Sequence, residues 1–383
     1  MSVDSNQWKR TSLCRRVLDL EMTLFNGQAF LWRRVERNGS MEYYGFMDNI
    51  LYGLRHGRSA VQPFDSDPVE FCVFGEDSQI RDHYDVLSEY FNLEVDLQSL
   101  RTTWCKADRK HLASICDKYE GIRVLTVDPL ECLLSFISSS NNNIKRISQM
   151  MWNLCEHFPQ NQVKASQVNL DFFRFPSLSQ LSEITETTLR ELGFGFRAPF
   201  IVRAIQQVIQ NGGIDWLRGL GKLSRMQACV ALQRIAGCGP KVANCFCMCS
   251  LRKFDSVPVD THCLQLMRKH YVSSDSPLLR GSSLSARKHD MLGDILRSIF
   301  GKFVSWAFML LFTAELADFR PRHQTRSRFF RSARSKAQRQ IFQQPAALEG
   351  PTRRRGAASP PRERSSAQVR EEEAEDSAGC DGP

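Results

Sequence analysis

The sequence predicts an α+β protein: a small antiparallel sheet domain packed on a domain of orthogonal helices, followed by a disordered C-terminal tail. Three observations predict this order. Strand-like patterns occupy residues 12–100, apolar residues at helical spacing occupy residues 106–318, and the apolar pattern then stops. With 383 residues, of which 42% are hydrophobic, the chain is long enough for about two to three domains. We therefore predict domains at 1–105, 106–318 and 319–383.

The N-terminal domain carries the signals of a sheet. Gly27–Phe30 and Tyr43–Leu54 have the aromatic and β-branched character of strands. Asn38–Gly39 is a typical pair for a tight hairpin turn. A helical pattern at His83–Phe91 follows the predicted strands.

The second domain is predicted to consist of several short helices joined by tight turns. Asp128 stands where an N-cap is expected and Pro129 at the first helical position, which together favour a helix start. Asn141–Asn143 interrupt the apolar pattern, and Gly212–Gly213 end a later helix. Helices are expected at Leu130–Ile137, Ile144–Leu154 and Ala198–Ile209, on both sides of Gly237–Pro240, and after Asp260 and Arg287.

The last segment, residues 319–383, is of low complexity. Arg353–Arg355 are followed by the acidic run Glu371–Asp376, and so few apolar groups cannot offset the entropy of ordering the chain. The whole chain carries a net charge of +9 and has a pI near 9.0, which favours a polyanionic partner.

The sequence does not predict a membrane protein. No segment has the roughly 18 uninterrupted apolar residues that a spanning helix needs. The longest apolar stretch, Phe303–Leu316, contains Ser305, Thr313 and Glu315, so we expect a buried helix there. Residues 1–20 lack the apolar core of a secretory signal, and we therefore expect a soluble intracellular protein.

The thirteen cysteines are predicted to be reduced and buried, because their number is odd and most lie in apolar, helix-like runs. A zinc site is possible in principle, but the sequence has no pair of C-x-x-C units. An iron–sulfur cluster near the C-terminal end of the fold is not expected either, since only Cys380 follows Cys263.

The most informative segment begins with a glycine hairpin. A helix is expected to end at Ile235–Ala236, Gly237–Gly239 to turn the chain, and a new helix to begin at Pro240–Lys241. Such a turn leaves backbone N–H groups directed outward at a helix N-terminus, where they can bind a phosphate. An ordinary corner between two helices would give the same pattern.

Lys241 lies in the first turn of the predicted helix. The positive end of the helix dipole opposes the ammonium charge there, and partial burial beside Cys245, one turn along, acts in the same direction. A lysine in such surroundings can form a Schiff base. A lysine that contacts phosphate or solvent is the alternative interpretation.

The segment Val257–His262 contains Asp260, which lies nineteen residues after Lys241. Pro258 forces an extended entry, and Asp260 stands where a helix N-cap is expected. Asp260 is therefore either a cap alone or a carboxylate that stabilises positive charge on a sugar as a base departs. His262 is either a surface residue or a phosphate contact.

The hairpin, the lysine and the Val-Pro-Val-Asp run together resemble the helix–hairpin–helix family of DNA glycosylases that have a Gly/Pro-rich loop and an aspartate. Within it the chain is similar to the eukaryotic 8-oxoguanine DNA glycosylases, from about Trp8 to Leu316. The remaining matching blocks are Gly27–Trp32, Ser139–Arg146, Gly193–Ala198, Trp306–Ala307 and Leu311–Leu316.

The resemblance implies roles in the chemistry and in base recognition. Lys241 would attack the deoxyribose C1′, and Asp260 would support it. The carbonyl of Gly27 would accept the N7 hydrogen that oxidised guanine has and guanine lacks. Phe312 would stack on a base flipped out of the duplex, and Cys245 would cover the other face of that base.

The resemblance also implies contacts to the rest of the duplex. Asn141 would fill the space left by the flipped base, and Arg146 and Arg197 would contact the orphaned cytosine. Phe196 would wedge into the base stack, where the family commonly has tyrosine. The remaining expected DNA contacts are Gly237, Gly239, Val242 and His262.

Two positions depart from the family. Ala236 replaces the usual proline before the hairpin, and Phe308 replaces a glutamine that reads the Watson–Crick edge of the flipped base. Phenylalanine cannot form hydrogen bonds, and a buried polar edge left unpaired costs about 1–3 kcal/mol. Substrate preference is therefore the part of the resemblance that Phe308 changes most.

The resemblance implies a bifunctional base excision repair enzyme, a DNA N-glycosylase and AP lyase, that acts on double-stranded DNA containing an oxidised purine. Two alternatives stay open: a helix–hairpin–helix glycosylase of altered lesion specificity, and a non-catalytic damaged-DNA-binding protein. Lys241 and Asp260 argue against the second, whereas Phe308 keeps it open. We expect a monomer with no cofactor, no metal and no membrane partner, in the nucleus, with the mitochondrion as a further location.

Binding to undamaged duplex DNA should weaken steeply with salt, because the hairpin amides, His262 and nearby basic residues are expected to contact phosphates. Several phosphate contacts imply a log–log slope of several units, at about 0.9 per phosphate. Titration of a labelled duplex at increasing salt measures this slope. A slope near zero would contradict the inferred electrostatic contacts.

Overall fold

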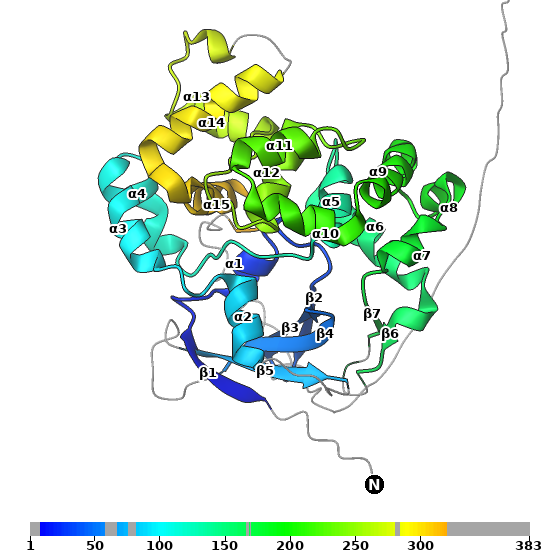
Figure 1. Cartoon of the computed structure of the whole chain (residues 1–383). Coiled ribbons are helices and arrows are strands. Elements are labelled where there is room, and N and C mark those ends of the chain that lie inside the picture. The colour runs from blue at the N-terminus through cyan, green and yellow to red at the C-terminus, as the bar shows by residue number, and fades with distance from the viewer. Residues whose placement is uncertain are drawn as a thin grey trace, which may run out of the picture. The chain divides into compact units, whose positions relative to one another are not determined.

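The computed structural model describes residues 8–57, 67–75, 82–165, 168, 170–279 and 284–319 (Figure 1). These residues form one compact unit that contains an antiparallel sheet and a larger set of helices. The sheet has the strand order β1-β5-β4-β3-β2. Its strands are β1 (Lys9–Cys14), β2 (Arg33–Arg37), β3 (Ser40–Met47), β4 (Ile50–His56) and β5 (Pro68–Phe74).

Left-handed residues form the two tight hairpins of the sheet. Asn38 and Gly39 connect β2 to β3 with φ angles of 49° and 70°, and Asp48 and Asn49 connect β3 to β4 with φ angles of 49° and 61°. Positive φ at both central residues gives a turn whose twist matches that of the paired strands. The predicted turn at Asn38–Gly39 is therefore confirmed.

The two faces of the sheet pack against different elements. Tyr43 faces the main core, whereas the adjacent Tyr44 belongs to a smaller cluster with Phe172. The alternation follows from the two-residue period of a strand. Phe172 lies on a short two-stranded ribbon, β6 (Gln162–Val163) paired with β7 (Phe172–Phe173), that covers this second face.

Four helices follow or precede the sheet strands. They are α1 (Leu20–Leu24), α2 (His83–Phe91), α3 (Leu97–Ala107) and α4 (Leu112–Ile115). The helix α2 has the predicted bounds, and Tyr90 on it accepts a 2.7 Å hydrogen bond from the indole of Trp32. The helix α1 lies between the sheet and the remaining helices (Figure 1).

The prediction of strand structure at Gly27–Phe30 was wrong. These residues lie in the loop between α1 and β2. Their apolar side chains are buried as those of a strand would be, but the side chain of Gln28, rather than a strand ladder, hydrogen-bonds the backbone of residues 123 and 125. The pattern indicated burial correctly and the type of structure incorrectly.

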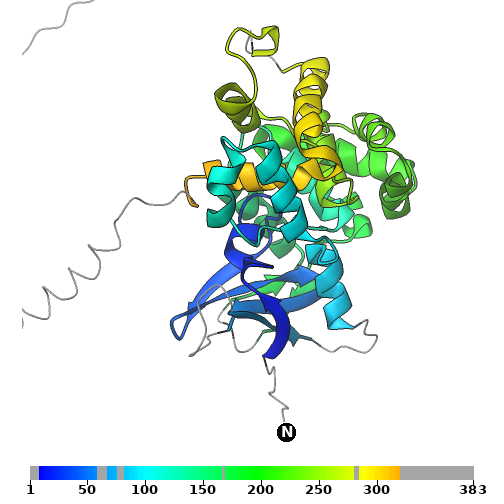
Figure 2. The same cartoon turned by 90° about the vertical axis from the view of Figure 1, so that its left-hand side faces the viewer.

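The helical part begins with α5. Its helices are α5 (Pro129–Ile137), α6 (Ile144–Glu156), α7 (Leu178–Ser182), α8 (Glu186–Glu191), α9 (Ala198–Gln210), α10 (Gly213–Gly219), α11 (Arg225–Leu232), α12 (Pro240–Cys249), α13 (Thr261–His270), α14 (Ala286–Phe300) and α15 (Val304–Glu315). Short 3₁₀ turns lie at Cys116–Lys118, Pro159–Asn161, Gly195–Arg197, Leu220–Lys222, Pro277–Leu279 and Gly301–Phe303. Both views show the sheet below α5 and α9–α15 (Figures 1 and 2).

Side-chain caps fix the starts of these helices. The Asp128 carboxylate accepts hydrogen bonds from the amides of Leu130 and Glu131, as the sequence predicts for this N-cap. The Asn143 side chain accepts from the Arg146 amide, so the predicted interruption at Asn141–Asn143 also starts α6. The helix α12 lies at the centre of the helical part, with residues 242–249 all buried.

A single apolar core extends from the sheet to the C-terminal helix, from Leu13 to Leu311. The predicted division at residue 105 therefore crosses a continuous core and stays a prediction. Phe319, which the sequence assigned to the tail, packs against this core, and the Tyr119 hydroxyl donates a 3.2 Å hydrogen bond to its carbonyl. The rest of the predicted tail lies outside the described residues.

The twelve described cysteines are all free, and ten of them are buried. The predicted reduced, buried thiols are thereby confirmed for this part of the chain. One helical run of the described residues, Ala286–Glu315, is long and apolar enough to cross a membrane, but 56% of its most apolar window is buried in the protein. It comprises α14 and α15, and the predicted buried helix at Phe303–Leu316 is the second of these.

Candidate active site

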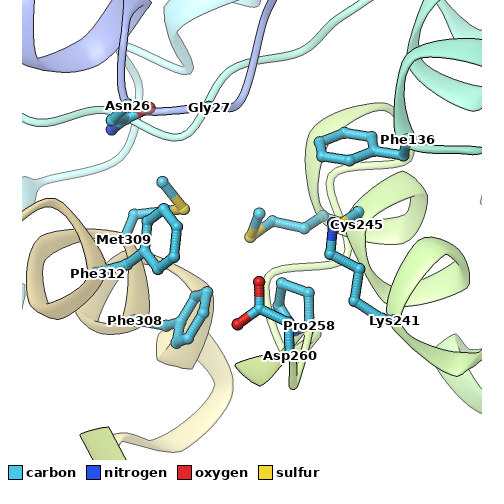
Figure 3. A pocket seen from close by; sticks show the side chains of 11 residues that line it. Asn26, Gly27, Phe136, Lys241, Cys245, Pro258, Asp260, Phe308, Met309 and Phe312 are labelled. Carbon is cyan, nitrogen blue, oxygen red and sulfur yellow. The ribbon is translucent and has the colours of Figure 1, made fainter. Parts of the chain in front are cut away.

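A pocket with a cavity volume of about 50 Å³ lies among segments that are far apart in the sequence. This volume is well below the range of about 300–1,000 Å³ for small-molecule sites. Six residues singled out from the sequence line it: Gly27, Lys241, Cys245, Asp260, Phe308 and Phe312. The other lining residues are Asn26, Phe136, Met248, Pro258 and Met309 (Figure 3).

The glycine hairpin has the predicted position between α11 and α12. Gly237 has a φ of +78°, and a Cβ at this residue would lie 2.9 Å from a methyl group of Ile137 and 3.1 Å from Phe200. Only glycine fits here. Gly239 is the N-cap of α12, and a Cβ there would meet nothing within 4 Å. Its surroundings are open, so a phosphate could approach the unpaired amides of the first turn.

Lys241 is the second residue of α12, and its side chain is fixed by a hydrogen bond. Its Nζ donates to Ser139 Oγ at 2.8 Å and lies 5.1 Å from the ring centre of Phe136. The Ser139 hydroxyl donates its own proton to the Phe136 carbonyl at 2.7 Å, so its oxygen is free to accept from the lysine. The amine is thereby held at the edge of the pocket.

Cys245 lies one turn beyond Lys241 on the same face of α12, as predicted. Its side chain is 3% exposed. Burial raises the pKa of the Cys245 thiol to about 11, although the charge of Lys241 opposes this effect. The thiol is therefore neutral near pH 7 and presents a polarisable surface to the pocket.

Asp260 is the helix cap that the sequence predicts, and its role at the sugar stays a prediction. Its Oδ1 caps α13 by accepting a 2.9 Å hydrogen bond from the Cys263 amide. The same carboxylate lines the pocket (Figure 3). His262 is exposed beside it, and its ring meets the Phe312 ring edge-on, with centroids 6.0 Å apart.

The helix α15 forms an apolar wall opposite Lys241 and Cys245. Phe308 and Phe312 lie one turn apart with ring centroids 5.8 Å apart and planes inclined by 29°. In Figure 3 these rings and Met309 face the side that carries Lys241, Cys245 and Phe136. Phe308 is 3% exposed and offers the pocket neither a donor nor an acceptor.

The loop that carries Gly27 is held by buried hydrogen bonds. Gln28 donates to the Arg123 carbonyl at 2.8 Å and accepts from the Leu125 amide at 3.0 Å. It also donates to Asn26, which in turn donates to the Thr313 hydroxyl on α15 at 3.1 Å. We call these contacts of Asn26 and Gln28 the Gly27-loop bridge.

Gly27 itself has a φ of +91°, and a Cβ at this residue would lie 3.1 Å from Ile144 Cδ1. Its left-handed conformation and this close approach both favour glycine. The Gly27-loop bridge fixes the residues on either side of it.

Four of the predicted DNA contacts lie outside the pocket, near the start of α6 and α9. Asn141 has a φ of +46°, Arg146 is exposed, and Phe196 is 52% exposed. Arg197 is only 2% exposed, and its guanidinium donates to the carbonyls of Ser140 and Asn141 at 3.0 and 2.9 Å. Arg197 therefore supports the Asn141 loop, and its contact to cytosine stays a prediction.

Val242 is 7% exposed, and its side chain belongs to the core. If Val242 contacts DNA, only its backbone amide in the first turn of α12 can do so.

Reasoning from the sequence missed several residues of the site. Ser139 lies in the matching block Ser139–Arg146, and that block is the sequence signal that could have indicated its contact with Lys241. Phe136 lies in the apolar stripe of α5, and Asn26 directly precedes Gly27. Their positions result from packing between distant segments, which no local pattern encodes.

Comparisons with known proteins agree with this geometry. The profile of the HhH-GPD superfamily of base excision DNA repair proteins matches residues 134–281, which include the hairpin, Lys241 and Asp260. The fold and the site thus define a helix–hairpin–helix DNA glycosylase. The profile of the 8-oxoguanine DNA glycosylase N-terminal domain matches residues 12–133. The chain belongs to the 8-oxoguanine DNA glycosylase family.

Individual relatives cover most of the chain. The N-glycosylase/DNA lyase OGG1 of Arabidopsis thaliana is 33% identical over 313 residues, which are 81% of this chain and 80% of the relative. The N-glycosylase/DNA lyase of Saccharomyces cerevisiae is 28% identical over 340 residues, or 82% and 87%. One similar structure is a crystal structure of the Clostridium acetobutylicum 8-oxoguanine glycosylase/lyase with double-stranded DNA that contains cytosine opposite 8-oxoG. Its TM-score is 0.63 at 25% sequence identity, and the match covers 80% of this chain and 96% of the Clostridium chain.

Replacing Gln28 by leucine should lower the free energy of unfolding by about 2–6 kcal/mol, because two buried backbone groups lose their partners at about 1–3 kcal/mol each. Urea denaturation measures the change. Gln149→Leu on the exposed face of α6 is the matched control, with an expected change within about 0.5 kcal/mol. Equal stability of the two variants would show that the Gly27-loop bridge does not stabilise the fold.

Proposed function

We propose that this protein is a base excision repair enzyme that removes 8-oxoguanine from duplex DNA by attack of Lys241 on C1′, and then cleaves the strand by β-elimination. The observation that carries the proposal is the convergence of the Lys241 amine and the Asp260 carboxylate on one pocket with a wall of aromatic rings. Family membership supports both activities, since its members named above are N-glycosylase/DNA lyases.

The proposed reaction uses only groups of this chain and the DNA. The neutral Nζ of Lys241 forms a bond to C1′ as the bond from C1′ to the base breaks, and the base leaves with a proton. The carboxylate of Asp260 stabilises the positive charge that develops on the sugar. Ring opening gives a Schiff base, from which loss of a 2′ proton expels the 3′ phosphate.

The position of Lys241 favours this role. At the start of α12, the hydrogen bond that Lys241 Nζ donates to Ser139 Oγ fixes the position of the amine. Asp260 is equally fixed because its Oδ1 caps α13. Both reacting groups therefore lie at the starts of helices, which are rigid supports for a catalytic pair.

Base recognition is proposed from the remaining walls. Phe312 would stack on one face of the flipped base, and Cys245 would cover the other. The Gly27 carbonyl would accept the N7 hydrogen of 8-oxoguanine. Normal guanine presents a lone pair at N7, so it would place an acceptor against an acceptor. The Gly27-loop bridge supports this role because it keeps the carbonyl from moving away.

Phe308 favours a second candidate, a glycosylase of the same family with altered lesion preference. The side chain is buried in the pocket wall beside Phe312 and cannot pair with the edge of a base. A non-catalytic damaged-DNA-binding protein is disfavoured, because Lys241 and Asp260 both face the pocket.

Double-stranded DNA is the proposed partner, with the hairpin amides, Asn141, Arg146 and Phe196 as contacts. We further propose that the protein acts as a monomer in the nucleus, with mitochondrial DNA as the alternative substrate. The exposed positions of Arg146 and Phe196 support these DNA contacts.

Lys241→Gln should abolish base release and strand cleavage on an 8-oxoguanine duplex while duplex binding persists, because the amide side chain cannot form a Schiff base. Single-turnover excision and a binding titration measure the two properties. Lys302→Gln, an exposed lysine before α15, is the matched control and should retain wild-type rates. Wild-type excision by Lys241→Gln would mean that another group is the nucleophile.

Phe308→Gln should raise the ratio of kcat/KM for 8-oxoguanine over other oxidised purines. The amide can pair with the base edge, whereas shape alone gives selectivity of roughly 10–200-fold. The comparison needs both enzymes on duplexes that differ only at the lesion. Leu310 is a core residue, so Leu310→Gln would not be a suitable control. Phe308→Leu keeps residue 308 apolar and should leave the kcat/KM ratio low. A flat or lower ratio for Phe308→Gln would show that residue 308 does not read the base.

A further inference from the structure

A cluster of three potential metal ligands lies outside the pocket. The ligand atoms of His111, His270 and Glu315 all lie within 4.8 Å of one another. His111 directly precedes α4, His270 is the last residue of α13, and Glu315 is the last residue of α15. The three residues thus come from three separate elements.

The two imidazoles have ring nitrogens without hydrogen-bond partners. The rings of His111 and His270 stack with centroids 3.4 Å apart and planes inclined by 7°. The Nε2 atoms of both rings are buried, and neither has a partner among the described residues. A buried polar atom without a partner costs free energy, and a missing ion or water is a common reason for one. Two such atoms beside a carboxylate point to an ion.

Charged and polar side chains surround the two imidazoles. Tyr271 donates a 2.7 Å hydrogen bond to Asp108, and Lys269 lies 3.3 Å from one oxygen of Glu315. A neutral imidazole offers the lone pair that a metal needs.

We propose that His111, His270 and Glu315 bind one divalent transition metal ion, of which zinc is the best match, through the two Nε2 atoms and a carboxylate oxygen. Two histidines and a glutamate are a known zinc ligand set, with water in the fourth position. Tetrahedral ligands at about 2.0–2.1 Å from the ion lie about 3.4 Å apart. The present spread of up to 4.8 Å therefore requires the side chains to close by roughly one ångström and the rings to tilt out of their parallel stack.

The ion would connect the helices that carry the active site without taking part in the reaction. His270 lies ten residues beyond Asp260 along α13, which is about 15 Å at 1.5 Å per residue. Glu315 ends α15, the helix that presents Phe308 and Phe312 to the pocket. Bound metal would thus hold the end of α13 to the end of α15. This proposal departs from the sequence-based expectation of a protein without metal, whereas the reaction proposed for the pocket uses no metal.

Metal-free protein titrated with Co²⁺ tests the site, because cobalt replaces zinc and its visible spectrum reports both geometry and ligand type. The wild type should take up about one equivalent with the intense d–d bands of a four-coordinate ion and no thiolate charge-transfer band. His111→Gln and His270→Gln should each weaken binding at least about tenfold. His157→Gln, an exposed histidine after α6, is the matched control and should bind as the wild type does.

Two further measurements keep the test decisive. Zn²⁺ should raise the Tm of the wild type and of His157→Gln but not that of the cluster variants, since only a folded site binds the ion. Glu315→Gln keeps both stacked rings, so it covers the case in which a histidine variant fails to fold, and it should also lose at least about tenfold in affinity. No uptake by the wild type, a thiolate band, or unchanged binding in Glu315→Gln and the folded histidine variants would overturn the proposal.

Discussion

The active-site pocket depends on the Gly27-loop bridge, the buried hydrogen bonds of Asn26 and Gln28. Gln28 reaches the backbone of residues 123 and 125, and Asn26 reaches Thr313 on α15. The Asn26 bond holds this loop against the C-terminal helix α15, and the Gln28 bonds hold it to the segment that precedes α5. Because the pocket walls come from this loop and from helices, the loop must be fixed before Gly27 can face Lys241 and Phe312.

The remaining groups of the site are positioned by helix starts. Lys241 follows a hairpin that only glycine permits at residue 237, and Asp260 is bound to the first turn of α13 through Cys263. A helix start combines a fixed backbone with unpaired amides and a positive potential. The same local feature can therefore bind phosphate, hold the amine of a lysine and orient a carboxylate, all of which a Schiff-base glycosylase uses.

Much of this arrangement could be predicted from the sequence, where the signal is local. The cap at Asp128, the turn at Asn38–Gly39 and the hairpin before Lys241 each depend on residues within a few positions of one another. The partners of Gln28 and of Lys241 could not be predicted, because Arg123 is 95 residues from Gln28 and Ser139 is 102 residues from Lys241. The spacing of apolar residues and the composition of a segment indicate that it is buried, but they do not distinguish a buried loop from a strand.

In the proposed function Phe308 affects which base is read, and the proposed reacting groups, Lys241 and Asp260, do not depend on it. The central claim is that Lys241 Nζ forms the covalent bond to the sugar. Borohydride reduction during turnover of an 8-oxoguanine duplex, followed by digestion and mass-spectrometric mapping of the cross-linked peptide, tests it most directly. A Schiff-base mechanism through Lys241 predicts that the sugar remnant is attached to this residue. An adduct on another amine, or base release without any covalent adduct, would contradict it.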